Sequence, residues 1–191
     1  MYQALLADTR FHQLLLQFDT DIAANARAAG CPDCGGVLHS ARFPRKPRGL
    51  PAGLGKCYHQ RLSFCCAADL CRHRNTPPSL RFLARKVYLG AIVVLVTTML
   101  HGATTRRVQC LSQLFGISRR TIARWREWWR TVFVRKPFWI VARGRFMPPV
   151  DLQRLPASLL ERFTGSTRDQ LISLLRFISP TTGGARFVQA N

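Results

Sequence analysis

The cysteines are the side chains in this sequence that are best suited to chemistry. Cys31 and Cys34 are two residues apart and are followed by Gly35 and Gly36. A Cys-x-x-Cys turn brings two sulfurs to one ion, and the glycines let the chain turn tightly after it. The N-terminus lacks the charged-then-apolar order of a secretory signal. We therefore expect a reducing compartment, where cysteines bind metal in preference to forming disulfides.

A tetrahedral zinc ion needs two further ligands, and the segment RLSFCCAADLCRH (residues 61–73) offers candidates for both. Cys66 and Cys71 would close a second short turn at the end of a strand, which leaves Cys65 pointing to the other side of that strand. The spacing predicts one structural Zn²⁺. Its predicted ligands are Cys31, Cys34, Cys66 and Cys71, with Cys65 and His73 as alternatives and Cys57, His59 and His39 in reserve.

Nothing typical of a catalytic centre accompanies these cysteines. A catalytic zinc keeps an open coordination position near a general base, whereas here four sulfurs would fill the site, and Asp33 and Asp69 lie inside the two turns. The chain has only 9 acidic residues, and no strand pattern brings several of them together for a magnesium site. A redox pair is disfavoured because no βαβ pattern surrounds Cys31. We expect a protein that is not an enzyme.

The segment RVQCLSQLFGISRRTIARWREWWR (residues 107–130) has the pattern of a helix-turn-helix. Apolar residues recur at helical spacing up to Phe115, Gly116 interrupts the pattern, and Ser118 stands where a helix N-cap belongs. The second helix is expected from Ser118 to about Phe133, with Trp125 and Trp129 in the core. The alternative is an ordinary helical hairpin with a solvated basic face.

Arginines on the predicted second helix suit the major groove of duplex DNA. The N-terminal residues of a recognition helix usually meet the base edges. The predicted reading residues are Ser118, Arg119, Arg120 and Arg124, with Glu127 as an acceptor from cytosine. The predicted phosphate contacts are Arg106, Arg107, Arg126 and Arg130. Arg45, Lys46 and Arg48, in a basic Pro/Gly-rich loop, are expected either to cross the DNA backbone or to enter a minor groove.

The overall charge favours a polyanionic partner. The sequence contains 29 Lys+Arg and 9 Asp+Glu, which gives a net charge of +20. Two basic blocks, residues 42–86 and 106–145, flank an apolar run at residues 87–100. That run is shorter than the ~20 residues that span a bilayer, so it predicts a buried core helix in preference to a membrane anchor. We expect a cytoplasmic, nucleoid-associated protein.

The helices and strands that the sequence predicts around these residues give a mainly α fold with a small β zinc ribbon. We expect an N-terminal helical segment (1–30), a zinc ribbon (31–75), a long helix plus helix-turn-helix (76–135) and a C-terminal helical segment with a loose tail (136–191). The expected strands are Val37–Phe43 and Tyr58–Cys65, and the expected helices include Leu80–Leu100, Leu155–Phe163 and Thr167–Phe177.

The motifs CPDCGG, FCCAADLCRHR and LSQLFGISRRTIARWREWW, in this order, resemble the zinc-ribbon and helix-turn-helix portion of mobile-element proteins. These include insertion-sequence transposases and their accessory factors, and the resemblance covers about residues 31 to 133. It implies recognition of element ends. Because no acidic catalytic core is recognisable, it implies an accessory DNA-binding factor or regulator that works beside a separate recombinase or transposase.

Two other classes of function fit the same residues. Arginines and a zinc ribbon equally suit an RNA-binding protein, and the basic faces equally suit a subunit of a nucleoprotein assembly. A helix-turn-helix often acts as a dimer on two half-sites, so a homodimer is compatible with the pattern. Of these partners the sequence favours double-stranded DNA. It predicts that the chain is stabilised by zinc and binds this DNA with sequence specificity.

Overall fold

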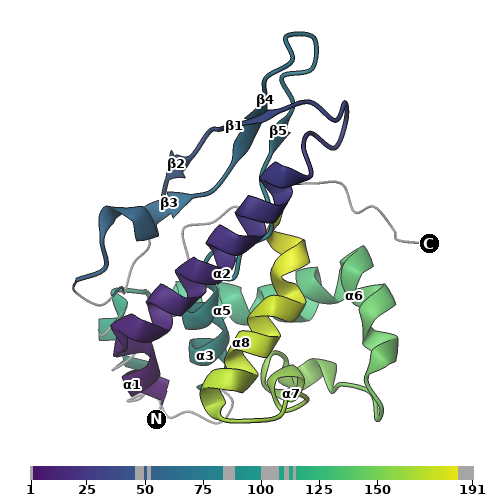
Figure 1. Ribbon diagram of the computed structural model, residues 1–191. Helices are drawn as coiled ribbons and strands as arrows, with labels where there is room; N and C mark the ends of the chain where they lie inside the picture. The colour runs from purple at the N-terminus through teal and green to yellow at the C-terminus, as the bar shows by residue number, and fades with distance from the viewer. Residues whose placement is uncertain are drawn as a thin grey trace.

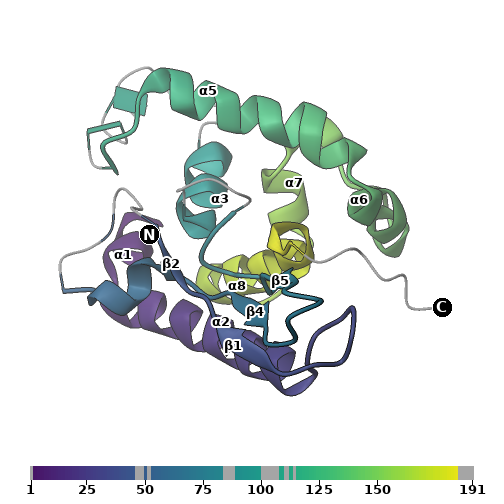
Figure 2. The same cartoon turned by 90° about the horizontal axis from the view of Figure 1, so that it is seen from above.

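The computed structural model describes residues 2–45, 50, 53–83, 89–99, 108, 109, 112, 113 and 115–184. Over these ranges the chain is mainly helical and carries two small antiparallel sheets (Figure 1). This agrees with the expected class, a mainly α protein with a small β unit. Figure 2 shows helix α5 on one side of the molecule and the three-stranded sheet toward the other, with α3 between them.

The predicted N-terminal helical segment consists of two helices. Helix α1 covers Tyr2–Ala7 and helix α2 covers Thr9–Ala28. The carboxylate of Asp8 accepts a hydrogen bond from the Arg10 backbone N–H at 2.9 Å and so caps α2. The buried face of α2 carries Phe11 and Leu15 near its start and Ala23 near its end. The first two join the main core, whereas Ala23 packs against the β unit.

The β unit consists of short strands. Strands β1 (Leu38–Ser40), β4 (Phe64–Cys66) and β5 (Arg74–Asn75) form an antiparallel sheet in the order β1-β4-β5. Strands β2 (Phe43–Pro44) and β3 (Gln60–Arg61) form a separate pair. Both predicted strands therefore exist but are divided. The residues before β3 form a 3-10 turn, η1 (Lys56–His59), which buries the Tyr58 ring instead of extending the strand.

The predicted helix Leu80–Leu100 is wrong at its start. Helix α3 covers Gly90–Met99, and residues 80–83 are not helical. Phe82 instead forms an isolated bridge with Leu89, and the Gly90 N–H donates to the Arg81 carbonyl at 2.7 Å. The Ser79 hydroxyl accepts from the Arg81 and Phe82 N–H groups at 3.2 Å. These bonds hold a turn before α3.

A buried ion pair explains why the chain turns there. The Arg81 guanidinium donates to the Asp19 carboxylate at 2.8 Å, and both side chains are almost fully buried. Arg81 also donates to the carbonyls of Tyr58 and Gln60, and the Leu80 N–H donates to Asp19 at 2.6 Å. Asp19 lies on α2, 62 residues before Arg81 in the sequence. In the structure it fixes the segment before α3, because a buried charge must be paired.

The arginine-rich segment forms the helix expected of it. Helix α5 covers Arg119–Glu127 and continues through a π-helical turn, η2 (Trp128–Val132), into a 3-10 turn, η3 (Phe133–Arg135). Helix α6 (Pro137–Ala142) and the 3-10 turn η4 (Arg143–Arg145) follow. Trp129, Phe133 and Trp139 are fully buried and their rings contact one another in sequence, which anchors this whole segment to the core.

The C-terminal elements close the main core. They are the 3-10 turn η5 (Leu152–Arg154), helix α7 (Ala157–Leu160), helix α8 (Thr167–Ile178) and the 3-10 turn η6 (Ser179–Thr182). Helix α8 agrees closely with the predicted helix Thr167–Phe177, and Ser166 with Asp169 forms a capping box at its start. The predicted helix Leu155–Phe163 is reduced to the four residues of α7.

Two buried cores divide the described residues. The larger one joins residues from all four predicted segments, as Leu15, Tyr58, Trp125 and Leu174 illustrate. The smaller one lies in the β unit and consists of Ala23, Cys31, Leu38, Leu62, Phe64 and Cys66. Two cysteines, Cys31 and Cys66, therefore belong to a core that contains few other apolar side chains. A β unit with so small a core needs an additional source of stability.

Candidate functional site

Four cysteines converge at the end of the three-stranded sheet. The sulfurs of Cys31, Cys34, Cys66 and Cys71 all lie within 4.8 Å of one another. The Cys34 and Cys66 sulfurs are 3.4 Å apart, and those of Cys31 and Cys71 are 3.7 Å apart. These separations are much longer than the ~2.05 Å of a disulfide bond. The four sulfurs could hold one metal ion, and they are the four predicted from the spacing.

The first turn of this cysteine cluster depends on its glycines. The Cys31 N–H donates to the Gly36 carbonyl at 2.9 Å, and the Gly35 N–H donates to the Cys31 carbonyl at 2.8 Å. Gly35 has a φ of 71°, which glycine adopts without strain. A Cβ atom on Gly36 would lie 3.3 Å from the sulfurs of both Cys34 and Cys66. Position 36 therefore leaves room for the sulfurs.

The second turn continues from strand β4. The Cys66 N–H donates to the His73 carbonyl at 2.9 Å, and the Cys71 N–H donates to the Ala68 carbonyl at 3.0 Å. Arg72 completes the turn with a φ of 45°, a left-handed conformation that is uncommon for residues other than glycine. The four-residue gap between Cys66 and Cys71 thus forms a compact turn opposite the first one.

The thiols of the cluster differ in acidity. Hydrogen bonding from the Asp33 N–H lowers the pKa of the Cys31 thiol to about 7, with a smaller contribution from the Cys34 N–H. The His73 N–H lowers the pKa of Cys71, but the neighbouring Cys34 sulfur and burial outweigh it and raise that pKa to about 12. Four adjacent sulfurs cannot all ionise on their own, and a cation among them would stabilise the thiolates.

An interaction that the sequence did not reveal joins the two turns. The His73 Nδ1 atom lies 2.6 Å from the Asp33 carboxylate. Asp33 was interpreted as a turn residue, and His73 as an alternative ligand. His73 is not one of the four clustered residues, and its ring instead contacts the opposite turn. Partners of this kind orient the ligands of metal sites.

The other candidate ligands lie outside the cluster. Cys65 is on the opposite side of β4, as predicted, and its thiol donates to the Arg72 carbonyl at 3.5 Å. His39 is exposed and pairs in register with Cys65, and Cys57 is exposed on η1. His59 belongs to η1 and is half-buried.

Helix α5 presents two contrasting faces. The Ser118 hydroxyl accepts from the Thr121 N–H at 3.2 Å, which caps the helix as predicted. Ile122 and Trp125 are buried, as is Trp129 in the following turn. The side chains predicted to read bases, Ser118, Arg119, Arg120 and Arg124, are all exposed. The apolar periodicity therefore placed both faces of this helix correctly.

The arginines of this segment are free of acidic partners. The four ion pairs among the described residues involve other cations. Arg124 donates to the Thr121 hydroxyl at 3.1 Å, and Arg130 donates to the Gln153 carbonyl at 3.3 Å. Both remain exposed, whereas Arg126 is half-buried. Glu127 is exposed on the same helix.

Of the remaining predicted DNA contacts, Arg45 lies within the described residues. Arg45 is half-buried, and its guanidinium lies 4.5 Å from the centre of the Phe43 ring. Arg106, Arg107, Lys46 and Arg48 lie outside the described residues.

The chain before α5 is described at a few positions. Residues 112, 113 and 115 are helical, and Gly116 has a φ of 60°. The Ile117 N–H donates to the Ser112 carbonyl at 3.1 Å, and the side chains of Phe115 and Ile117 are buried. The rest of the predicted first helix of the helix-turn-helix lies outside the described residues. The glycine and the cap stand where the sequence pattern placed them.

Comparison of the chain with protein-family models, with curated proteins and with solved structures finds no match. Among the helices that the structure describes, none has the length and apolar character needed to cross a membrane.

Proposed function

We propose that this chain is a zinc-stabilised protein that binds double-stranded DNA with sequence specificity, and that α5 enters the major groove. The observation that carries the proposal is a set of exposed arginines without acidic partners, Arg119, Arg120 and Arg124, on a helix whose other face is buried. Guanidinium groups bond in bidentate fashion to guanine edges and to phosphates. The resemblance to mobile-element proteins favours an accessory factor or regulator.

The geometry of the cysteine cluster supports zinc as its metal. Zinc binds thiolate sulfurs at about 2.3 Å in tetrahedral geometry, which places the sulfurs about 3.8 Å apart. The sulfur pairs at 3.4 and 3.7 Å are close to that value. Four thiolates would complete the coordination shell, so the ion would stabilise the fold and leave no position for a substrate. Its binding energy would support the small core of the β unit.

The position of α5 supports groove binding. Its capped N-terminus carries Ser118, Arg119 and Arg120, and recognition helices contact bases with the residues of this end. Buried Trp129 and Phe133 hold the helix against the core, so that its arginines project from a rigid support. The net charge of +20 would attract the phosphate backbone before specific contacts form.

The proposed zinc site is tested by measuring the metal content of the purified chain. We expect one zinc per chain by mass spectrometry under native conditions. The Cys34→Ser variant should lose most of that zinc, while Cys65→Ser, whose sulfur lies outside the cluster, should retain it. Equal zinc retention by the two variants would contradict the assigned ligand set.

The DNA proposal is tested by selection from a random duplex library at physiological salt, with structured RNA in a parallel arm. We expect an enriched duplex motif, and Arg120→Ala should lose discrimination at one position by about 1–3 kcal/mol. Arg168→Ala, which removes an exposed arginine of α8, is the matched control and should retain the motif. Binding without any enriched motif, or preference for RNA, would overturn the proposal.

A further inference from the structure

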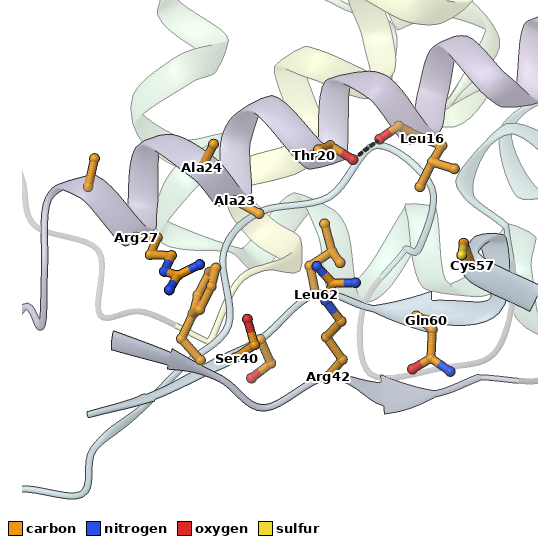
Figure 3. A pocket seen from close by; sticks show the side chains of 13 residues that line it. Leu16, Thr20, Ala23, Ala24, Arg27, Ser40, Arg42, Cys57, Gln60 and Leu62 are labelled. Carbon is orange, nitrogen blue, oxygen red and sulfur yellow. Dashed lines mark hydrogen bonds between the residues drawn. The ribbon is translucent and has the colours of Figure 1, made fainter. Parts of the chain in front are cut away.

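A groove lies between helix α2 and the strands of the β unit. Its volume is about 680 Å³. The helix lines one wall with Leu16, Ala23 and Ala24, and the strand segment opposite contributes Leu62 and Phe64 (Figure 3). This volume falls within the range of about 300–1,000 Å³ that is typical of small-molecule sites, which are mostly apolar with a few polar groups. We refer to it as the α2–β groove.

Two arginines face into the α2–β groove. Arg27 comes from the last turn of α2, and Arg42 comes from the segment between β1 and β2. Figure 3 shows both guanidinium groups directed into the space between the helix and the strands. Neither takes part in an ion pair with another described residue, although all nine acidic side chains lie in the described ranges. The groove therefore combines a mostly apolar lining, interrupted by Thr20, Ser40, Gln60 and Ser63, with two positive charges that no described carboxylate pairs.

We propose that the α2–β groove binds an anionic amphiphile, a small molecule with an apolar chain and a carboxylate head. The arginines would bind the carboxylate through charge-assisted hydrogen bonds, and the chain would cover Ala24 and Leu62. A neutral apolar ligand would desolvate the guanidinium groups without pairing them, which costs free energy. A small inorganic anion would leave the apolar walls in water. This inference does not depend on DNA binding or on α5.

Decanoate is the probe for the ligand class, measured by isothermal titration calorimetry on the full-length, metal-loaded chain. We expect saturable binding with one decanoate per chain. Decan-1-ol, which has no charge, and butanoate, whose apolar chain is short, should each bind at least about tenfold more weakly, the size expected for a lost charge-assisted hydrogen bond or a few lost methylenes. Equal binding of decanoate and decan-1-ol would overturn the assigned role of the arginines, and equal binding of butanoate would overturn that of the apolar walls.

Variants locate the bound probe. Arg42→Gln removes a charge from the groove, and Ala24→Phe fills it from a position that is exposed and therefore tolerant of a larger side chain. Both should weaken decanoate binding by about tenfold or more. Arg10→Gln, on the same helix but outside the groove, is the matched control and should bind normally. Circular dichroism checks folding, and Arg27→Gln replaces Arg42→Gln if the latter fails to fold.

Two outcomes would overturn the α2–β groove as the site. One is unchanged decanoate affinity in both groove variants. The other is a loss of affinity in Arg10→Gln as large as in Arg42→Gln, which would mark binding to the positive charge of the chain in general. Absence of saturable decanoate binding at millimolar concentration would contradict the ligand class itself.

Discussion

Gly36 shapes the cysteine cluster although it carries no ligand. Its missing side chain leaves space for two sulfurs, because a Cβ atom would lie 3.3 Å from both Cys34 and Cys66. Such a contact is shorter than usual, so at least one sulfur would have to move. Metal affinity depends on ligand geometry, and small displacements of the sulfurs are therefore costly.

The Gly36→Ala variant should bind zinc more weakly, by at least about tenfold, the lower end of the loss seen when groups that orient ligands are changed. Competition with a chromophoric chelator measures this affinity. Gly55→Ala is the matched control, because a Cβ atom at Gly55 meets nothing within 4 Å. Equal affinity in the two variants would show that the sulfurs tolerate the added methyl group.

His12 is a buried histidine with structural contacts. Its Nε2 atom lies 2.9 Å from the Leu6 carbonyl, and its Nδ1 atom lies 3.1 Å from the Tyr58 hydroxyl. A neutral ring satisfies both contacts by donating to Leu6 and accepting from Tyr58. Burial lowers the pKa of His12 below its ordinary value of 6.5, against a smaller opposing effect of the Leu6 carbonyl.

This lowered pKa makes stability depend on pH. Below pH 6.5 the unfolded chain takes up a proton at His12 before the folded chain does, so the free energy of unfolding should fall as the solution is acidified. Urea unfolding at about pH 7.5 and about pH 5.5 measures the difference. The His12→Gln variant should lose less stability than the unmodified chain over this interval, and His39→Gln, at an exposed position, should behave like the unmodified chain.

At the scale of elements, local sequence patterns predicted the features that depend on neighbouring residues. The spacing of Trp125 and Trp129 predicted the buried face of α5 and the turn after it, and the alternation in FCC separated Cys65 from Cys66. These predictions rest on periodicity and turn chemistry, which involve neighbouring residues. The four residues of the cysteine cluster could also be predicted from the sequence, because only a few spacings allow four sulfurs to meet.

The features that the sequence did not predict depend on contacts between residues that are far apart in the chain. The helix predicted from Leu80 begins at Gly90, because Asp19 pairs with Arg81, 62 residues away. No local pattern contains that pairing. The Asp33–His73 contact and the α2–β groove were missed for the same reason, since each joins segments whose proximity only the tertiary fold creates.

The β unit and the helical core should respond differently to metal removal. The smaller core contains few apolar residues besides two of the clustered cysteines, whereas α8 buries Leu171, Leu174 and Leu175 in the larger core. Addition of a strong zinc chelator should therefore expose the amides of β1, β4 and β5 to hydrogen exchange and leave those of α8 protected. Uniform loss of protection would indicate one cooperative unit, and unchanged protection would contradict a stabilising role for the metal.

At the scale of the whole molecule, charge should dominate any association with nucleic acid. A net charge of +20 attracts phosphates without regard to sequence, and the logarithm of such affinity falls linearly with the logarithm of salt concentration. Contacts to phosphate contribute to this slope, whereas contacts to bases determine specificity. The two kinds of contact can therefore be separated by experiment.

Arg130→Ala should weaken binding to all duplexes about equally and reduce the slope of the salt dependence by about 1. This side chain is exposed beyond the end of α5, where a phosphate contact is expected. Fluorescence anisotropy over a series of salt concentrations measures the slope, on the selected motif and on a scrambled duplex. A selective loss on the motif alone would assign Arg130 to base reading.

The buried guanidinium of Arg61 connects the middle of the chain with its far end. It donates to the carbonyls of Pro77 and Thr182, and its side chain is almost completely enclosed. During synthesis on the ribosome, Arg61 emerges long before Thr182 does. A nascent chain that stops short of residue 182 therefore lacks one of the two carbonyls that bind Arg61 in the folded protein, and this contact of strand β3 can form only after that segment has been made.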